Sequence, residues 1–99
     1  MSDFNKPILI VNPTYSTRGE IRALLSDAGF RHIDEAGDGL EAINMLNQQA
    51  YELVITDIDL QNLDAWRLAR LIRSNMLTSP AETKIVVLSS TYAERIAEA

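Results

Sequence analysis

The chain has 99 residues, of which 46% are hydrophobic and 23% charged, and none is cysteine. This composition is typical of one soluble globular domain, and the lack of cysteine excludes disulfides, thiolate metal sites and cysteine nucleophiles. The formal net charge of −5 argues against direct binding of nucleic acid, which needs a basic excess. The apolar runs are too short for a membrane span or a signal peptide, so we expect a cytoplasmic protein without a membrane contact.

The first half of the chain predicts two strands and two helices. The apolar run from Ile8 to Val11 indicates a buried strand, and Thr17 with Glu20 is predicted to form a capping box that opens a helix ended by Gly29. The segment 31–35 alternates between polar and apolar residues, as an edge strand does, and its histidine, His32, is expected to be exposed. The apolar faces of the two helices are predicted to be Ile21, Leu24, Leu25 and Ala28, then Leu40, Ile43 and Leu46.

The second half repeats this alternation. A third strand is predicted over Leu53 to Thr56 and a fourth over Ile85 to Leu88, with a loop at 78–80 and a second capping box at Thr91 and Glu94. The helix between these strands is marked by Trp66, Leu68, Ala69, Leu71 and Ile72. Right-handed crossovers then give an α/β doubly wound, three-layer sandwich with a parallel sheet in the order 2-1-3-4.

Asp57 follows the third predicted strand directly. Open α/β sheets carry their sites beyond the carboxyl ends of their strands, so Asp57 is the leading candidate for a functional residue. Asp59 and Asp64 are expected to be a turn residue and a helix-start residue. Arg67, Arg70 and Arg73 share one side of the third helix and are predicted to form a solvated face.

These residues resemble the receiver domains of bacterial response regulators. The similarity covers the segment Asp57 to Trp66, the strand ending in Leu88-Ser89-Ser90, the helix that starts at Arg18-Gly-Glu-Ile-Arg-Ala-Leu-Leu, and Glu35-Ala-Gly-Asp-Gly39-Leu-Glu-Ala, in register from about Lys6 to the last residue. The resemblance implies a flavodoxin-like fold and a single receiver-like domain over residues 1–99. It also implies that Asp57 accepts a phosphoryl group from a histidine kinase, that Ser89 hydrogen-bonds this group, and that Mg²⁺ assists the transfer.

The sequence departs from the receiver pattern where the metal should bind. Receivers carry two acidic residues after the first strand, whereas this chain has Asn12 and Pro13. Asp57 and Asp59 then remain as weak metal ligands, if any, and Asn12 could add a weak ligand through its side-chain carbonyl oxygen. We therefore expect Mg²⁺ binding to be weak or absent.

The resemblance also implies a fifth strand and helix, with a lysine that pairs with the phosphoryl group. The only lysines here are Lys6 and Lys84, and neither follows a strand at that place, so we expect a domain truncated after its fourth helix. Without a fifth strand, the strand from Ile85 to Leu88 is an apolar edge, which predicts a homodimer, a domain swap or cover by another part of a longer protein.

Two functions from different classes remain. The first is an atypical two-component signalling module, without enzyme activity, that regulates a partner or output domain by protein contact. Within it, phosphorylation is either lost, which we favour, or persists weakly at Asp57. The second is a flavodoxin-like electron carrier that binds FMN, with the hydroxyl-rich loop 13–17 as a phosphate cradle. A hydrolase or phosphatase that uses Asp57 as nucleophile lacks a general acid or a metal cluster nearby.

Overall fold

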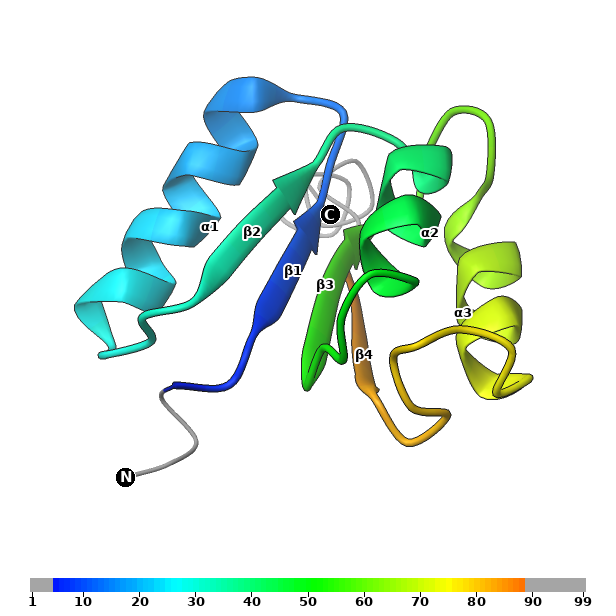
Figure 1. The fold of residues 1–99 in the computed structure, drawn as a ribbon. Coiled ribbons are helices and arrows are strands. Elements are labelled where there is room, and N and C mark those ends of the chain that lie inside the picture. The colour runs from blue at the N-terminus through cyan, green and yellow to red at the C-terminus, as the bar shows by residue number, and fades with distance from the viewer. Residues whose placement is uncertain (1–4, 89–99) are drawn as a thin grey trace, which may run out of the picture.

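The computed structural model describes residues 5–88, which form one parallel sheet of four strands with three helices between them (Figure 1). The elements, in chain order, are β1 (Ile8–Val11), α1 (Tyr15–Asp27), β2 (Ile33–Ala36), α2 (Gly39–Leu46), β3 (Leu53–Asp57), α3 (Ala65–Arg73) and β4 (Lys84–Leu88). The sheet order is β2-β1-β3-β4, as predicted. Ser89 and the capping box predicted at Thr91 and Glu94 lie outside the described residues.

The helices cover the two faces of this sheet. In the sheet, β2 lies on one side of β1, whereas β3 and β4 lie on the other side. Because each crossover is right-handed, this reversal of direction places α1 on one face of the sheet and α2 with α3 on the other. The three-layer prediction is thereby confirmed. No helix within residues 5–88 is long and apolar enough to cross a membrane.

The main hydrophobic core lies between the sheet and the pair α2 and α3. Strand residues that alternate toward this face meet one apolar stripe from each helix, which is the pattern that a buried parallel sheet requires. The cluster consists of Leu9, Val11, Ala36, Ala42, Leu46, Tyr51, Val54, Leu68 and Ile72.

Two predicted helix features are wrong. Helix α1 begins at Tyr15 after Thr14, so Thr17 and Glu20 lie inside the helix and form no capping box. The predicted apolar faces also include residues that the structure exposes, namely Leu24 (71%), Leu40 (58%) and Trp66 (60%). Gly29 does end α1, and its φ of 109° is the left-handed conformation that favours glycine after a helix.

The start of the second strand needs a small correction, and the arginine face of α3 is as predicted. Strand β2 is an edge strand, as expected, but it begins at Ile33, so His32 precedes it; the His32 side chain is 45% exposed. The predicted solvated face is confirmed, because Arg67, Arg70 and Arg73 are all exposed. In addition, the Nη1 atom of Arg73 donates hydrogen bonds of 2.6 Å to the carbonyl oxygens of Ala81 and Thr83. Arg73 thus holds the loop that leads into β4 against the end of α3.

Strand β4 forms the other edge of the sheet as far as the structure describes it. Its burial alternates, with Lys84, Val86 and Leu88 exposed and the two residues between them half-buried. The exposed set faces the α1 side, since Val86 is paired with Ile55 and Leu88 with Asp57. Within residues 5–88, no strand pairs with the outer side of β4, and whether another segment covers this side stays a prediction.

Candidate functional site

Asp57 is the last residue of β3, at the carboxyl edge of the sheet. Strands β1 and β3 are parallel neighbours with Val11 opposite Thr56, so Asn12 follows β1 directly beside Asp57. The fold thus brings together the two positions that the sequence singled out separately. The Asp57 side chain is half-buried, and its carboxylate makes no hydrogen bond or ion pair with any other residue in the range 5–88. Within residues 5–88, the Asp57 carboxyl group is therefore partly accessible to solvent and has no cationic side chain paired with it.

Asn12 stabilises the turn between β1 and α1 at this edge. Its side chain is buried, and its Oδ1 atom accepts a hydrogen bond of 2.9 Å from the backbone N–H of Thr14, at the entry to α1. The side chain of Thr14 makes no capping bond, so the Asn12 amide holds the turn that precedes the helix. Pro13 is exposed and offers no side-chain donor or acceptor.

The residues present do not fit a magnesium ion held in the manner that the resemblance implies. That arrangement needs three carboxylates, whereas the positions after β1 carry an amide engaged in a turn and a proline ring. Among the residues that the structure describes, no three His, Cys, Asp or Glu side chains come close enough to hold a metal ion. Asp59 lies exposed in the loop after β3.

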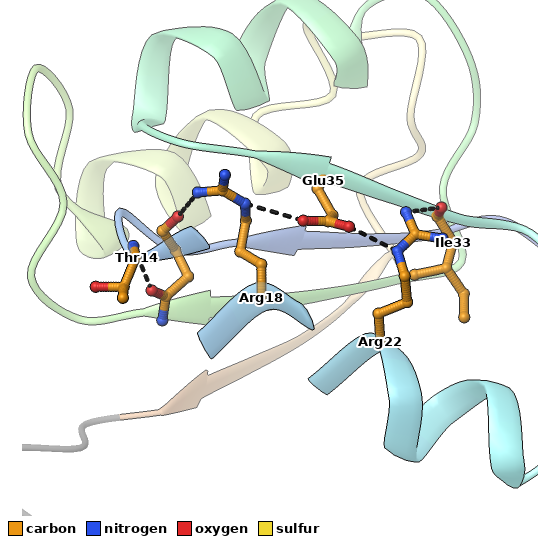
Figure 2. A network of polar contacts seen from close by, with 6 residues as sticks. Thr14, Arg18, Arg22, Ile33 and Glu35 are labelled. Carbon is orange, nitrogen blue, oxygen red and sulfur yellow. Dashed lines mark hydrogen bonds and ion pairs between the residues drawn. The ribbon is translucent and has the colours of Figure 1, made fainter. Parts of the chain in front are cut away.

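Two arginines of α1 clamp Glu35 of β2 next to this edge (Figure 2). Arg18 donates from Nε to Glu35 Oε1 (3.0 Å) and from Nη1 to the carbonyl oxygen of Asn12 (2.6 Å). Arg22, one turn further along, donates from Nε to Glu35 Oε2 (2.6 Å) and from Nη2 to the carbonyl oxygen of Ile33 (2.7 Å). The hydrogen bond from Arg22, together with Arg18, lowers the pKa of Glu35 below its usual value.

This clamp was not predicted as an interaction. The signal available in the sequence was the spacing of four residues between Arg18 and Arg22, which places both on one side of a helix. The sequence alone does not show that this side faces β2 and its glutamate.

The loop after Asp57 is fixed to the start of α2. Asp38 caps α2 by accepting a hydrogen bond of 2.8 Å from the N–H of Glu41, and its second oxygen accepts one of 2.9 Å from Asn62 in the loop. These bonds lower the pKa of Asp38, with the Glu41 bond the larger cause. The N–H of Gly39 also bonds the carbonyl oxygen of Gln61 at 3.3 Å. The segment beside the candidate site is thus anchored by both backbone and side chains.

The loop ends in a second capped helix. Asp64 precedes α3, and its Oδ1 atom accepts a hydrogen bond of 2.8 Å from the N–H of Arg67. The prediction that Asp64 starts a helix is confirmed. Ser89, the predicted phosphoryl contact, follows the last described residue of β4.

A separate polar network closes the opposite end of the sheet. The Tyr51 hydroxyl donates a hydrogen bond of 2.6 Å to Asp34 Oδ2 and accepts one of 2.8 Å from Gln49. Burial and the neighbouring Asp34 raise the pKa of Tyr51 to about 12, so the phenol stays neutral at physiological pH. Ser79 and Thr83 bind the backbone of Tyr51, which ties the loop before β4 to the start of β3. This network is structural and lies far from Asp57.

Comparison with known proteins agrees with this geometry. The family model of the response regulator receiver domain matches residues 8–99. The chain is 35% identical over 71 residues to chemotaxis protein CheY-3 of Vibrio cholerae, covering 72% of the chain and 55% of that protein. It is 33% identical over 73 residues to sensor protein EvgS of Escherichia coli K12, covering 74% of the chain but only 6% of the sensor.

Solved structures show the same fold. The chemotaxis response regulator CheY4 of Vibrio cholerae superposes with a TM-score of 0.77 at 23% identity, covering 95% of this chain and 77% of the other. The receiver domain of sensor histidine kinase PA1611 from Pseudomonas aeruginosa PAO1, solved with a magnesium ion in its active-site cleft, gives 0.77 at 24% identity, with 95% and 75% covered. The comparisons support a signalling receiver and not the flavodoxin-like FMN carrier.

Proposed function

Since the chain belongs to the response regulator receiver domain family, we propose that it is an atypical receiver that regulates a partner or output domain by protein contact, with Asp57 at the phosphoacceptor position. Receiver domains of this family are signal-transduction modules of two-component systems and in general are not enzymes. The upstream partner in such a system is a histidine kinase. We place the domain in the cytoplasm, without direct contact to nucleic acid or membrane, in keeping with its net charge of −5.

We infer an atypical receiver from the two residues after β1. They are Asn12 and Pro13 and not a pair of acids, and the Asn12 amide accepts a hydrogen bond from Thr14. A carboxylate about 4 Å from a divalent cation gains roughly 8 kcal/mol of gross attraction at an effective dielectric of 20, although desolvation offsets much of this. Loss of two such carboxylates weakens Mg²⁺ binding by orders of magnitude. In the first form of the proposal, Mg²⁺ is therefore weakly bound or absent, and metal-assisted phosphorylation of Asp57 is lost.

One observation at Asp57 supports the less favoured second form of the proposal, in which weak phosphorylation persists. The Asp57 carboxylate is accessible and has no partner elsewhere in the described chain, so it is available as a nucleophile. Ser89 follows β4 and would supply the hydrogen bond to the phosphoryl group.

Incubation with acetyl phosphate and Mg²⁺, followed by intact-mass measurement, separates the two forms. We expect no mass increase for the natural chain. An adduct of one phosphoryl group that disappears in Asp57→Ala would refute the first form and establish the second. The variant Asn12→Asp/Pro13→Asp serves as the positive control, because it restores the two missing carboxylates beside an otherwise unchanged strand end.

A further inference from the structure

We propose that the outer face of α3 binds an acidic segment of a partner protein, with Arg67 and Arg70 holding its carboxylates and Trp66 as the apolar contact beside them. This inference rests on the proposed function and deepens it, because it gives the chemistry of the partner that a receiver acting by protein contact would bind. Helix α3 (Ala65–Arg73) contains three arginines and no acidic residue, although the whole chain has a formal net charge of −5.

Arg67 and Arg70 lie on the side of α3 that points away from the sheet. The buried residues of this helix are Ala65, Leu68 and Ile72. A step of two residues along an α-helix turns through about 200°. Arg67 and Arg70 each stand two residues from a buried one, so both lie on the opposite side and are exposed. A further strand next to β4 would extend the sheet in its own plane and would leave this outer face open.

The charges of these two arginines have little compensation within residues 5–88. The Arg70 side chain makes no hydrogen bond or ion pair there. Arg67 Nε is 3.9 Å from Asp64 Oδ2, but the two side chains are 71% and 47% exposed, and such a pair contributes little to stability. Arg67 lies in the first turn of α3, where the helix dipole disfavours a cation, and like charges three residues apart repel each other. An external anion would relieve both effects.

Other arginines of the chain hold the fold together, which Arg67 and Arg70 do not. Arg18 and Arg22 bind Glu35, and Arg73 binds the loop before β4. The neighbour of the two free arginines is Trp66, which is exposed and stands one helical turn before Arg70. Tryptophan and arginine are the residue types that contribute most often to binding energy in protein interfaces. Their combination on one helix face therefore favours a protein contact.

An acidic peptide segment matches this face in charge and in spacing. At three residues apart on a helix, the Cβ atoms of Arg67 and Arg70 are about 5–6 Å from each other. Carboxylates one turn apart on a partner helix have the same separation, and each fits the fork of a guanidinium group. An apolar side chain between them would cover Trp66. A nucleic-acid duplex is a longer polyanion, which would also meet the acidic excess of the rest of the chain.

Fluorescence tests the binding, because Trp66 is the only tryptophan of the chain. The probe is a synthetic helical peptide without aromatic residues that carries two glutamates one turn apart and a leucine on the same side. Its twin has glutamine in place of both glutamates. The glutamate peptide should shift the Trp66 emission to shorter wavelength in a saturable way, and added salt should weaken this binding. No shift, an equal shift with the twin, or binding that salt does not change would overturn the proposal.

Paired variants test the location. Arg67→Gln/Arg70→Gln should weaken the peptide affinity about tenfold, because two ion pairs are lost, and should keep the urea midpoint of the natural chain. Arg31→Gln/Lys84→Gln is the matched control, since it removes two exposed charges away from α3, and it should bind as the natural chain does. Equal losses in the two variants would show that net charge, and not this face, attracts the peptide.

A short DNA duplex separates the acidic segment from nucleic acid as the occupant. The duplex should leave the Trp66 emission unchanged at concentrations where the glutamate peptide saturates it. A shift at lower concentrations of duplex than of peptide would overturn the assignment to a protein partner. None of these measurements involves phosphorylation, so failure here leaves the mass measurement on Asp57, and the function that it tests, unaffected.

Discussion

Gly39, the first residue of α2, is the position where one added methyl group should do the most damage near the candidate site. A Cβ atom there would lie 2.1 Å from the carbonyl oxygen of Leu63, whereas ordinary contact begins at 3.4 Å, so the backbone of the loop must retreat by 3.4 − 2.1 = 1.3 Å. The loop cannot do so without losing the bond from Gly39 to Gln61. Overpacking of this kind costs about 1–3 kcal/mol and the lost hydrogen bond about 1 kcal/mol.

The opposing effect is helix propensity, which favours alanine over glycine by about 1 kcal/mol inside a helix and less at its first residue. The cost of overpacking is therefore larger than the gain in helix propensity. We expect Gly39→Ala to lower the free energy of unfolding by about 2–3 kcal/mol. Gly19 on α1 is the matched control, since a Cβ there meets nothing within 4 Å. Gly19→Ala should raise the free energy of unfolding by roughly 0.5–1 kcal/mol.

Urea unfolding followed by far-ultraviolet circular dichroism measures both variants against the natural chain. For a domain of this size, each 1 kcal/mol also shifts the Tm by about 4–8 °C, so thermal unfolding gives an independent reading. A Gly39→Ala chain as stable as the natural one would show that the loop after Asp57 is not held against α2 as described. A Gly19→Ala chain that is less stable would contradict the propensity argument.

Three further predictions concern single groups. Glu35→Gln should lower stability by about 1 kcal/mol at neutral pH, because it weakens two charged hydrogen bonds at a partly exposed site. The pKa of Glu35 is lowered in the folded chain, so this contribution to stability is fully present above pH 4.5 and is lost as the pH falls through the lowered pKa. The stabilities of the natural chain and of Glu35→Gln should therefore converge in acid unfolding. Tyr51→Phe should cost about 1–2 kcal/mol in urea unfolding and should remove the absorbance step near pH 12 from the tyrosine titration; persistence of this step would mean that another phenol gives rise to it. Asn12→Asp/Pro13→Asp should gain at least tenfold in Mg²⁺ affinity by calorimetry, and an unchanged affinity would show that the two lost carboxylates do not explain weak metal binding.

The strands and their order could be predicted from the sequence because buried parallel strands are continuous apolar runs. Ile8 to Val11 and Leu53 to Thr56 have this character, and the alternating segment before Ala36 is typical of an edge. The positions of the helices followed from the same alternation. The pattern does not show which side of each helix packs against the sheet. For this reason Leu24 and Leu40 were expected to be buried, but both are exposed.

The start of α1 shows how a local rule fails. Thr17 and Glu20 satisfy the spacing of a capping box, but the helix already starts at Tyr15 because Asn12 and Pro13 set the turn before it. A helix can start at any of several neighbouring residues, and the sequence alone does not show that the turn at Asn12 starts this helix before Thr17.

The neighbourhood of Asp57 was predicted only in part. Its place at the carboxyl edge beside Asn12 follows from parallel strands, which end at the same side of a sheet. The clamp of Arg18 on Glu35 and the contact of Gly39 with Leu63 join segments that are far apart in the chain. Such contacts depend on the final distance between two helices and a strand, which no periodicity encodes.

The tight approach of Gly39 to Leu63 has a mechanical consequence. Because Gly39 and Leu63 are in close contact, the first turn of α2 and the loop backbone at Leu63 can separate only if the hydrogen bond from Gly39 to Gln61 breaks. Amide hydrogens on both sides of this junction should exchange with solvent at matching rates.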